Sequence, residues 1–292
     1  MGEDAMSVES GARAITVTTF EIRPADGGPP VRGDVRVAEG TRPKTAVVIV
    51  HGFKGFRRFG AWGALARALA LRGHAAVTFD FSHNGIDENG EFSRLDLFRL
   101  NTHSREVDEL RAVLDALASG AIGGRKSPRV GLLGHSRGGA GAIIAAAEDT
   151  RVRALVTWAS IASIGDRWTE EEKAAWRRGD DVLSLNSRTR QQMPLAPEYW
   201  VDLQVNRDRL DVAAAAARVT VPWLIVHGDA DTTVPVDDAH ALFDAAGENA
   251  ELMIMEGVDH GMGARHPYPG PTDALRAAAE AAFEWFGEHL EG

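Results

Sequence analysis

The sequence predicts an α/β protein with a mostly parallel, doubly wound sheet and an inserted helical cap. Apolar runs rich in valine, isoleucine and leucine alternate with helical patterns along most of the chain, as expected for a sheet covered on both faces. The alternation stops between residues 164 and 218 and then resumes. We therefore expect a core domain built from residues 1–163 and 219–292, and a cap formed by residues 164–218.

Composition narrows the class of protein. With 292 residues, of which 44% are hydrophobic, the chain can bury one large core with some decoration. The formal net charge of -10 argues against nucleic acid or an anionic membrane as a partner, because phosphate binding needs clustered Lys and Arg. The absence of cysteine excludes disulfides, thiolate metal sites and a cysteine nucleophile.

Two features bear on location. No apolar run of the sequence reaches the length needed to span a membrane. Residues 1–10 are acidic and lack the apolar segment of a secretory signal. We therefore expect a cytoplasmic protein.

The first half of the chain begins with two alternating segments that predict an antiparallel hairpin, and it continues with buried strands. The expected elements are strands at 12–24, 31–38, 46–50 and 75–81, a helix at about 60–72, and a helix capped by Ser104 or a neighbour. The polar stretch 82–102 is a long loop, which usually has a functional reason to exist. A short apolar run from residue 130 predicts the strand that leads to Ser136.

The second half contains the predicted cap and the return to the sheet. The expected elements are strands at 153–160, 222–227 and 251–255, short helical pieces between 164 and 218, and helices at about 236–246 and 272–289. The pattern extends the parallel sheet by three strands.

The motif G-x-S-x-G at 134–138 suggests a nucleophile. It lies between an apolar run and an alanine-rich helical pattern, which is the strand, turn and helix context that this motif requires. Glycines at both ends allow a strained turn whose flanks pass close to neighbouring backbone. Ser136 at the apex is therefore a candidate serine nucleophile.

Partners for this serine follow later strands. In a parallel α/β sheet, functional groups gather at the carboxyl ends of the strands. Asp229 and Asp231 follow the strand at 222–227, and His260 follows the strand at 251–255. The order nucleophile, acid, histidine agrees with a Ser-His-Asp triad, although the spacing alone leaves either aspartate as the acid.

These segments together resemble the α/β-hydrolase superfamily, and most of all the capped esterases of the cinnamoyl or feruloyl esterase-like and dienelactone hydrolase-like group. The resemblance covers nearly the whole chain and is carried by HGF at 51–53, FDFS at 79–82, GHSRGG at 134–139, HGDADTTVP at 227–235 and DHG at 259–261. Dienelactone hydrolases use a cysteine nucleophile, which this chain lacks, so the resemblance favours ordinary esters. Where the resembling esterases often carry Gly-His-Gly after the strand aspartate, this chain has SHNG at 82–85.

The resemblance also implies the rest of the site. The resembling esterases place the acid three residues after the Gly of a His-Gly pair, which favours Asp231 and leaves Asp229 as a turn-forming residue. The backbone N–H groups of Phe53 and Arg137 are implied as the oxyanion hole.

The side chains around this site have two interpretations each. Trp168, Trp176, Tyr199 and Trp200 would contact substrate or form the core of the cap. Arg137, Lys54 and Arg57 would attract a carboxylated substrate, but solvated surface charge is the simpler interpretation. The three glutamates at 170–172 would bind a substrate amine or, more simply, complement a helix dipole.

We therefore predict a serine hydrolase that cleaves carboxylic esters with small to medium acyl or aryl groups and needs no metal or other cofactor. One alternative is a peptidase or amidase on the same triad, and another is a binding protein on the same fold. The pattern D-x-D-x-T at 229–233 also matches phosphatases with an aspartyl nucleophile. Those enzymes have this motif near the start of the chain and a lysine downstream, whereas every lysine here precedes it.

Overall fold

The computed structural model describes residues 13–25, 27–124, 126–127 and 129–290. Residue 12 of the predicted first strand and the expectation about residues 1–10 lie outside the described residues. The strands within these ranges are β1 (Ile15–Ile22), β2 (Val31–Ala38), β3 (Thr45–Val50), β4 (Ala75–Asp80), β5 (Arg129–His135), β6 (Val152–Trp158), β7 (Val182–Leu185), β8 (Gln192–Leu195), β9 (Trp223–Gly228) and β10 (Ala250–Met255).

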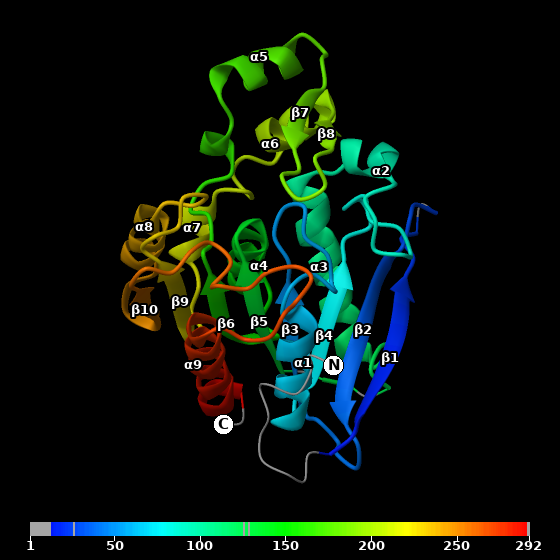
Figure 1. Cartoon of the computed structure of the whole chain (residues 1–292), viewed down its shortest axis with the longest axis vertical. Helices are drawn as coiled ribbons and strands as arrows, with labels where there is room; N and C mark the ends of the chain where they lie inside the picture. The colour runs from blue at the N-terminus through cyan, green and yellow to red at the C-terminus, as the bar shows by residue number, and fades with distance from the viewer. Residues whose placement is uncertain (1–12, 26, 125, 128, 291–292) are drawn as a thin grey trace.

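Eight of these strands form one twisted sheet in the order β1-β2-β4-β3-β5-β6-β9-β10 (Figure 1). β1 and β2 make an antiparallel hairpin, and β2 pairs antiparallel with β4. The six strands from β4 to β10 are all parallel. The predicted mostly parallel α/β fold and its hairpin at the start are therefore confirmed.

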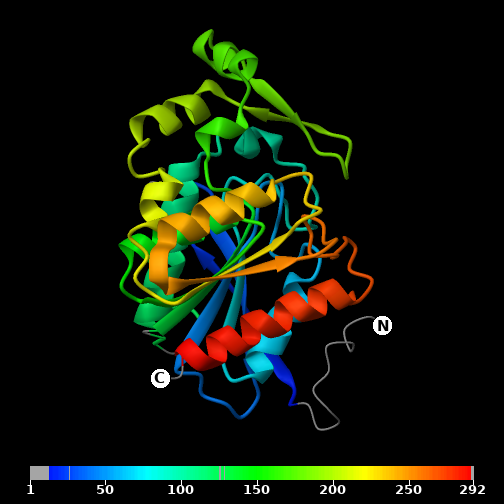
Figure 2. The same ribbon diagram turned by 90° about the vertical axis from the view of Figure 1, so that its left-hand side faces the viewer.

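Helices cover both faces of the sheet. They are α1 (Trp62–Leu71), α2 (Leu95–Arg99), α3 (His103–Ser119), α4 (Arg137–Glu148), α5 (Glu170–Arg177), α6 (Pro197–Val205), α7 (Val212–Ala216), α8 (Val236–Ala246) and α9 (Asp273–Leu290), with short 3-10 turns η1 (Gly165–Arg167) and η2 (Gly247–Asn249). α1 and α9 lie on one face, and α3, α4 and α8 lie on the other (Figures 1 and 2).

The central position of β3 in the sheet explains its unbroken run of apolar residues. Val48 and Val50 pack into the core beneath α3 and α4, whereas Val47 and Ile49 pack into the core beneath α1 and α9. All six residues of β3 are buried. Both faces of a central parallel strand are covered by helices, which favours apolar side chains on both faces.

The stretch 82–102 is more ordered than a plain loop. It contains α2, and Phe92 and Phe98 are buried in the core. The N-cap of α3 is Thr102, a neighbour of Ser104, and its hydroxyl accepts from the Arg105 N–H at 3.4 Å. Ser104 instead donates to Asp202 of α6 through both its N–H and its hydroxyl.

Segment 164–218 lies over the carboxyl ends of the parallel strands (Figure 1). It contains α5, α6 and α7, as the expected short helical pieces, but also the antiparallel hairpin β7–β8, so the prediction of a purely helical segment is corrected. Each of these strands has four residues, too few to show an alternating pattern in the sequence. That this segment is a separate cap domain stays a prediction.

Candidate active site

Ser136 lies at a tight turn between β5 and α4. Its backbone has φ 56° and ψ -123°, and its N–H donates to the Trp158 carbonyl at 2.9 Å. A Cβ at position 138 would lie 2.4 Å from the carbonyl oxygens of Val50 and His51, and one at position 134 would lie 2.7 Å from the carbonyl oxygen of Gly138. The two glycines are therefore required by close backbone approach, as the motif predicts.

The structure brings Ser136, His260 and Asp231 together. His260 Nε2 lies 3.1 Å from Ser136 Oγ, and His260 Nδ1 lies 2.7 Å from Asp231 Oδ2. The serine and histidine are partly exposed, whereas the side chain of Asp231 has no exposed surface. With Nδ1 protonated, the imidazole presents a lone pair to the serine hydroxyl, which is the arrangement required of a general base.

Asp231 is held as an anion by donors on both oxygens. Burial acts to raise its pKa, but the hydrogen bonds from His227, His260 and the Val234 N–H outweigh burial, and the pKa lies well below its usual range. Oδ1 also accepts from the Thr233 N–H at 2.7 Å. These backbone bonds fix the carboxylate in the orientation that faces His260.

Asp229 has a different place. Its side chain is exposed, and its Oδ1 accepts from the Gly257 N–H at 2.6 Å, which links the turn after β9 to the turn after β10. It contacts neither His260 nor Ser136 through any hydrogen bond of the described residues. The geometry therefore favours Asp231 over Asp229 as the partner of the histidine.

Three other histidines are part of the scaffold around the site. His227 has no exposed surface and donates from Nε2 to the Val234 carbonyl at 2.9 Å. Its Nε2 also lies 3.4 Å from Asp231, a contact that the sequence did not reveal. His135 Nε2 bonds to the His260 carbonyl at 2.9 Å, and burial lowers the pKa of His135 to about 3, so this ring stays neutral. His51 bonds to the carbonyl of Gly52 at 2.9 Å.

Two backbone N–H groups are available beside Ser136. Phe53 follows β3, and Arg137 is the first residue of α4. Neither N–H has an acceptor among the described residues. The loop after β3 lies against the serine, since a Cβ at Gly52 would be 3.0 Å from Ser136 Cβ. Both N–H groups are therefore candidate donors to a negative oxygen formed at a carbon bound to Ser136.

The arginine and lysine side chains near the site are not the solvated surface charges we expected. Arg137 is buried, and its Nε donates to Glu106 of α3 at 2.8 Å. Arg57 pairs with Asp80 at 2.6 Å, and Lys54 donates to the hairpin β7–β8. Their partners are far away in the sequence, so no local pattern predicted these contacts.

The four aromatic residues singled out in the sequence form one cluster. Trp176 and Tyr199 are almost fully buried, and their rings lie 5.2 Å apart. Trp168 is half-buried and lies with its ring 6.5 Å from that of Phe53, whereas the half-buried Trp200 stacks on Trp176. Trp176 and Tyr199 are thus core residues of segment 164–218, and Trp168 is the one of the four that contacts the loop after β3.

Two of the glutamates at 170–172 have structural partners. Thr169 and Glu172 form a capping box at the start of α5, and Glu170 accepts from Lys173 at 3.0 Å. The helix begins with three acidic residues, which complement its dipole. These contacts agree with the structural interpretation of the three glutamates.

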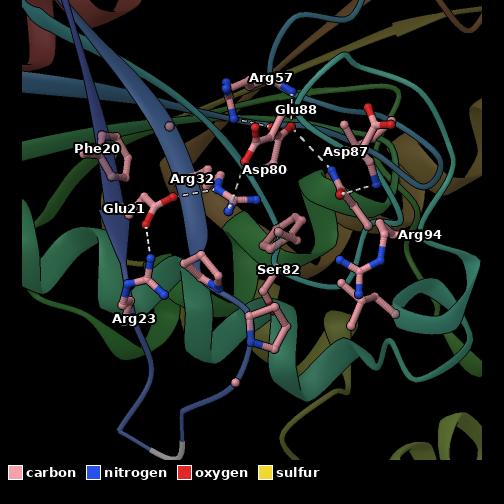
Figure 3. A pocket seen from close by; sticks show the side chains of 18 of the residues that line it. Phe20, Glu21, Arg23, Arg32, Arg57, Asp80, Ser82, Asp87, Glu88 and Arg94 are labelled. Atoms are coloured by element: carbon pink, nitrogen blue, oxygen red, sulfur yellow. Dashed lines mark hydrogen bonds and ion pairs between the residues drawn. The ribbon is translucent and has the colours of Figure 1, made fainter.

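A charged cleft of about 840 Å³ lies between the first hairpin and the loop after β4 (Figure 3). Its arginines pair with neighbouring carboxylates: Glu21 accepts from Arg23 and Arg32, and Asp80 accepts from Arg57. Neither Ser136 nor His260 lines this cleft. We place the candidate active site at Ser136, because there a serine hydroxyl, a histidine and a buried aspartate form one hydrogen-bonded chain.

Two kinds of feature are absent from the described residues. Within residues 13–25, 27–124, 126–127 and 129–290, no group of three or more His, Cys, Asp and Glu side chains is arranged to hold a metal ion. In the same part of the chain, no helix combines the length and the apolar character that a bilayer crossing requires.

The fold and the site together define a class. A parallel α/β sheet with a serine at a strained strand-to-helix turn, a histidine and an aspartate after later strands, is the architecture of α/β hydrolases. The model of the family described as "Alpha/beta hydrolase family" matches residues 47–277 of this chain. The protein belongs to that family.

Known proteins resemble the chain over most of its length. An uncharacterized 31.7 kDa protein from the traX-finO intergenic region of Escherichia coli is 26% identical, over 87% of this chain and 94% of that protein. The esterase domain of a Rhodothermus marinus protein has 19% identity and a TM-score of 0.62, covering 94% of this chain and 99% of that one. Est1E from Butyrivibrio proteoclasticus has 20% identity and a TM-score of 0.66 over the same shares. At these identities the two solved structures show a common fold.

Proposed function

We propose that the protein is a serine hydrolase that cleaves carboxylic esters through an acyl-enzyme. The observation that carries this proposal is the hydrogen-bonded chain from Ser136 through His260 to Asp231, at 3.1 and 2.7 Å. Membership of the α/β hydrolase family supports hydrolysis as the reaction class. The esterases among its structural neighbours make ester chemistry the first choice to test.

The mechanism follows from the geometry. Ser136 Oγ attacks the ester carbonyl while His260 Nε2 takes its proton, and the N–H groups of Phe53 and Arg137 donate to the oxyanion of the tetrahedral intermediate. The intermediate collapses when protonated His260 gives its proton to the leaving alcohol oxygen, which leaves an acyl group on Ser136. A water molecule then attacks this acyl group with His260 again as base, and the acid product departs.

The proposed substrates are small to medium esters, aryl esters included. Phe53 and the half-buried Trp168 offer aromatic surface close to the loop after β3. An apolar or aromatic group that fills such a site gains roughly 1 to 3 kcal/mol, whereas a peptide amide also needs partners for its own N–H and C=O groups. The Glu172 carboxylate accepts from the Thr169 N–H, and the Glu170 carboxylate accepts from Lys173, which favours an ester over a substrate with an amino terminus.

A covalent probe tests the proposal directly. A fluorophosphonate should label wild-type protein at Ser136, identified by peptide mass spectrometry, and should leave Ser136→Ala unlabelled. An ester panel with phenyl, cinnamoyl and long-chain acyl groups, assayed beside an aminoacyl amide, gives the substrate class. Equal labelling of the alanine variant, or turnover of the amide alone, would contradict the proposed esterase.

A further inference from the structure

The turn at residues 52–55 contains a lysine in the left-handed conformation. The Gly55 N–H donates to the Gly52 carbonyl at 2.9 Å and closes the turn, and Lys54 in the third position has φ 58°. Glycine adopts this conformation without steric cost, whereas a lysine does not. The conformation of Lys54 therefore depends on contacts outside the turn.

Those contacts come from the hairpin β7–β8. Lys54 Nζ donates to the Ser184 hydroxyl at 2.8 Å and to the Leu185 carbonyl at 2.7 Å. Arg188, in the loop of the same hairpin, donates from Nη2 to the Lys54 carbonyl at 3.1 Å. One hairpin thus binds both the side chain and the backbone of Lys54.

The hairpin has its own supports. Buried Asn186 accepts on Oδ1 from the Arg188 N–H at 3.2 Å, and Gln191 Nε2 donates to the Phe92 carbonyl at 3.0 Å. The Arg188 guanidinium lies 4.3 Å from the centre of the Phe59 ring. The hairpin can therefore hold Lys54 from a fixed position.

The turn at residues 52–55 also sets the direction of the Phe53 N–H. The Gly52 carbonyl and the Phe53 N–H belong to one planar peptide unit and point in opposite directions. The carbonyl is fixed by two donors, the Gly55 N–H and His51 Nδ1, each at 2.9 Å. Loss of the turn would remove the first of these bonds and leave the peptide held by His51 alone, so its orientation would be less closely fixed.

We infer that Lys54 is a positioning residue of the proposed esterase, which keeps the Phe53 N–H directed at the oxyanion through its bonds to Ser184 and Leu185. The inference rests on the proposed function. It makes the hairpin β7–β8 a support of the oxyanion hole in addition to a cover over the strand ends.

Substitution of Lys54 tests this role. Lys54→Met keeps the steric cost of the left-handed conformation but loses the bonds that hold it, so the turn should relax. The kcat for a phenyl ester should then fall about tenfold, short of the full loss of one oxyanion donor, while KM changes by less than about twofold. Lys54→Gly should keep more activity than Lys54→Met, because glycine needs no outside contact to hold the turn. Lys54→Arg should recover part of kcat, since it keeps a cationic donor.

A transition-state mimic separates positioning from general stability. Phenylboronic acid forms a tetrahedral adduct with a nucleophilic serine, so its affinity should fall in Lys54→Met in parallel with kcat. Lys173→Met is the matched control, because Lys173 bonds to Glu170 of its own helix, and its kcat should equal that of wild type. If Lys54→Met does not fold, Ser184→Ala replaces it and should lower kcat by a smaller factor.

The outcomes are distinct. Three results would overturn the positioning role and leave the proposed esterase intact: a wild-type kcat in Lys54→Met, a change in KM alone, or equal losses of kcat in the methionine and glycine variants. A wild-type protein that neither reacts with a fluorophosphonate nor hydrolyses any ester would overturn the proposed function, and the positioning role with it.

Discussion

Replacement of Asp231 by asparagine is the sharpest test of the triad. Oδ1 of Asp231 accepts from the N–H groups of Thr233 and Val234 at 2.7 and 2.9 Å, so in Asp231→Asn the amide oxygen must stay at that position. The amide NH2 then replaces Oδ2 and faces the Nδ1–H of His260, where two donors meet. His260 must shift its proton to Nε2 or turn away, and in either case it loses the lone pair that faces Ser136.

The expected loss is large. A wrong histidine tautomer in an otherwise intact triad lowers kcat by about 10⁴, which corresponds to about 5 kcal/mol of transition-state stabilisation. Asp229→Asn is the matched control. It keeps an oxygen that accepts from the Gly257 N–H and lies on an exposed side chain, so kcat should stay within about twofold of wild type.

Initial-rate kinetics on a phenyl ester, with circular dichroism to verify folding, measure both variants. Our reasoning would be refuted if folded Asp231→Asn kept a tenth of wild-type kcat, or if Asp229→Asn lost as much as Asp231→Asn. In the second case the acid would be misassigned, while Ser136 as the nucleophile would be unaffected.

Three further predictions follow from other contacts. Gly138→Ala should yield little folded protein, because its Cβ would lie 2.4 Å from two backbone oxygens. The control is Gly141→Ala, where a Cβ meets nothing within 4 Å, and equal soluble yields of the two variants would contradict the prediction. Burial raises the pKa of Glu109 from 4.5 to about 7, so the folded state retains a proton that the unfolded chain releases, and stability is lost as pH rises through this interval. Glu109→Gln should therefore have a higher melting temperature than wild type at pH 8 but not at pH 4. The same difference in melting temperature at both pH values would rule out the titration of Glu109 as its cause. If the Trp168 ring contacts the aryl group of the substrate, Trp168→Ala should raise KM for an aryl ester by roughly 10-fold more than KM for an acetate ester. An equal change in KM for both substrates would place Trp168 in the core alone.

The sheet was predictable because its signals are local. The buried strands β3, β5 and β9 are continuous apolar runs, and Ser136 lies in a motif whose glycines are required by contacts within a few ångströms. The hairpin β7–β8 was not predictable, since each strand has only four residues and two exposed positions of β7 carry the apolar Leu183 and Leu185 in place of polar side chains.

The residues around the triad were harder to interpret for a physical reason. Arg137 pairs with the Glu106 carboxylate, and Lys54 donates to uncharged acceptors at 184 and 185, so their environments depend on partners that are 31 and about 130 positions away. The choice between Asp229 and Asp231 needed a resemblance to known esterases, because both residues follow the same strand. Only the folded geometry separates the aspartate that faces His260 from the one that joins two turns.

The backbone at Ser136 also limits which nucleophiles evolution or a protein engineer can install there. A φ of 56° with ψ -123° is unfavourable for any side chain, and it is worst for one that branches at Cβ. Threonine carries the same hydroxyl but adds a branch, whereas cysteine differs from serine by a single atom and keeps the same shape. The sharp turn that exposes the hydroxyl thus permits a thiol at position 136 by a single substitution, Ser136→Cys, and disfavours threonine there.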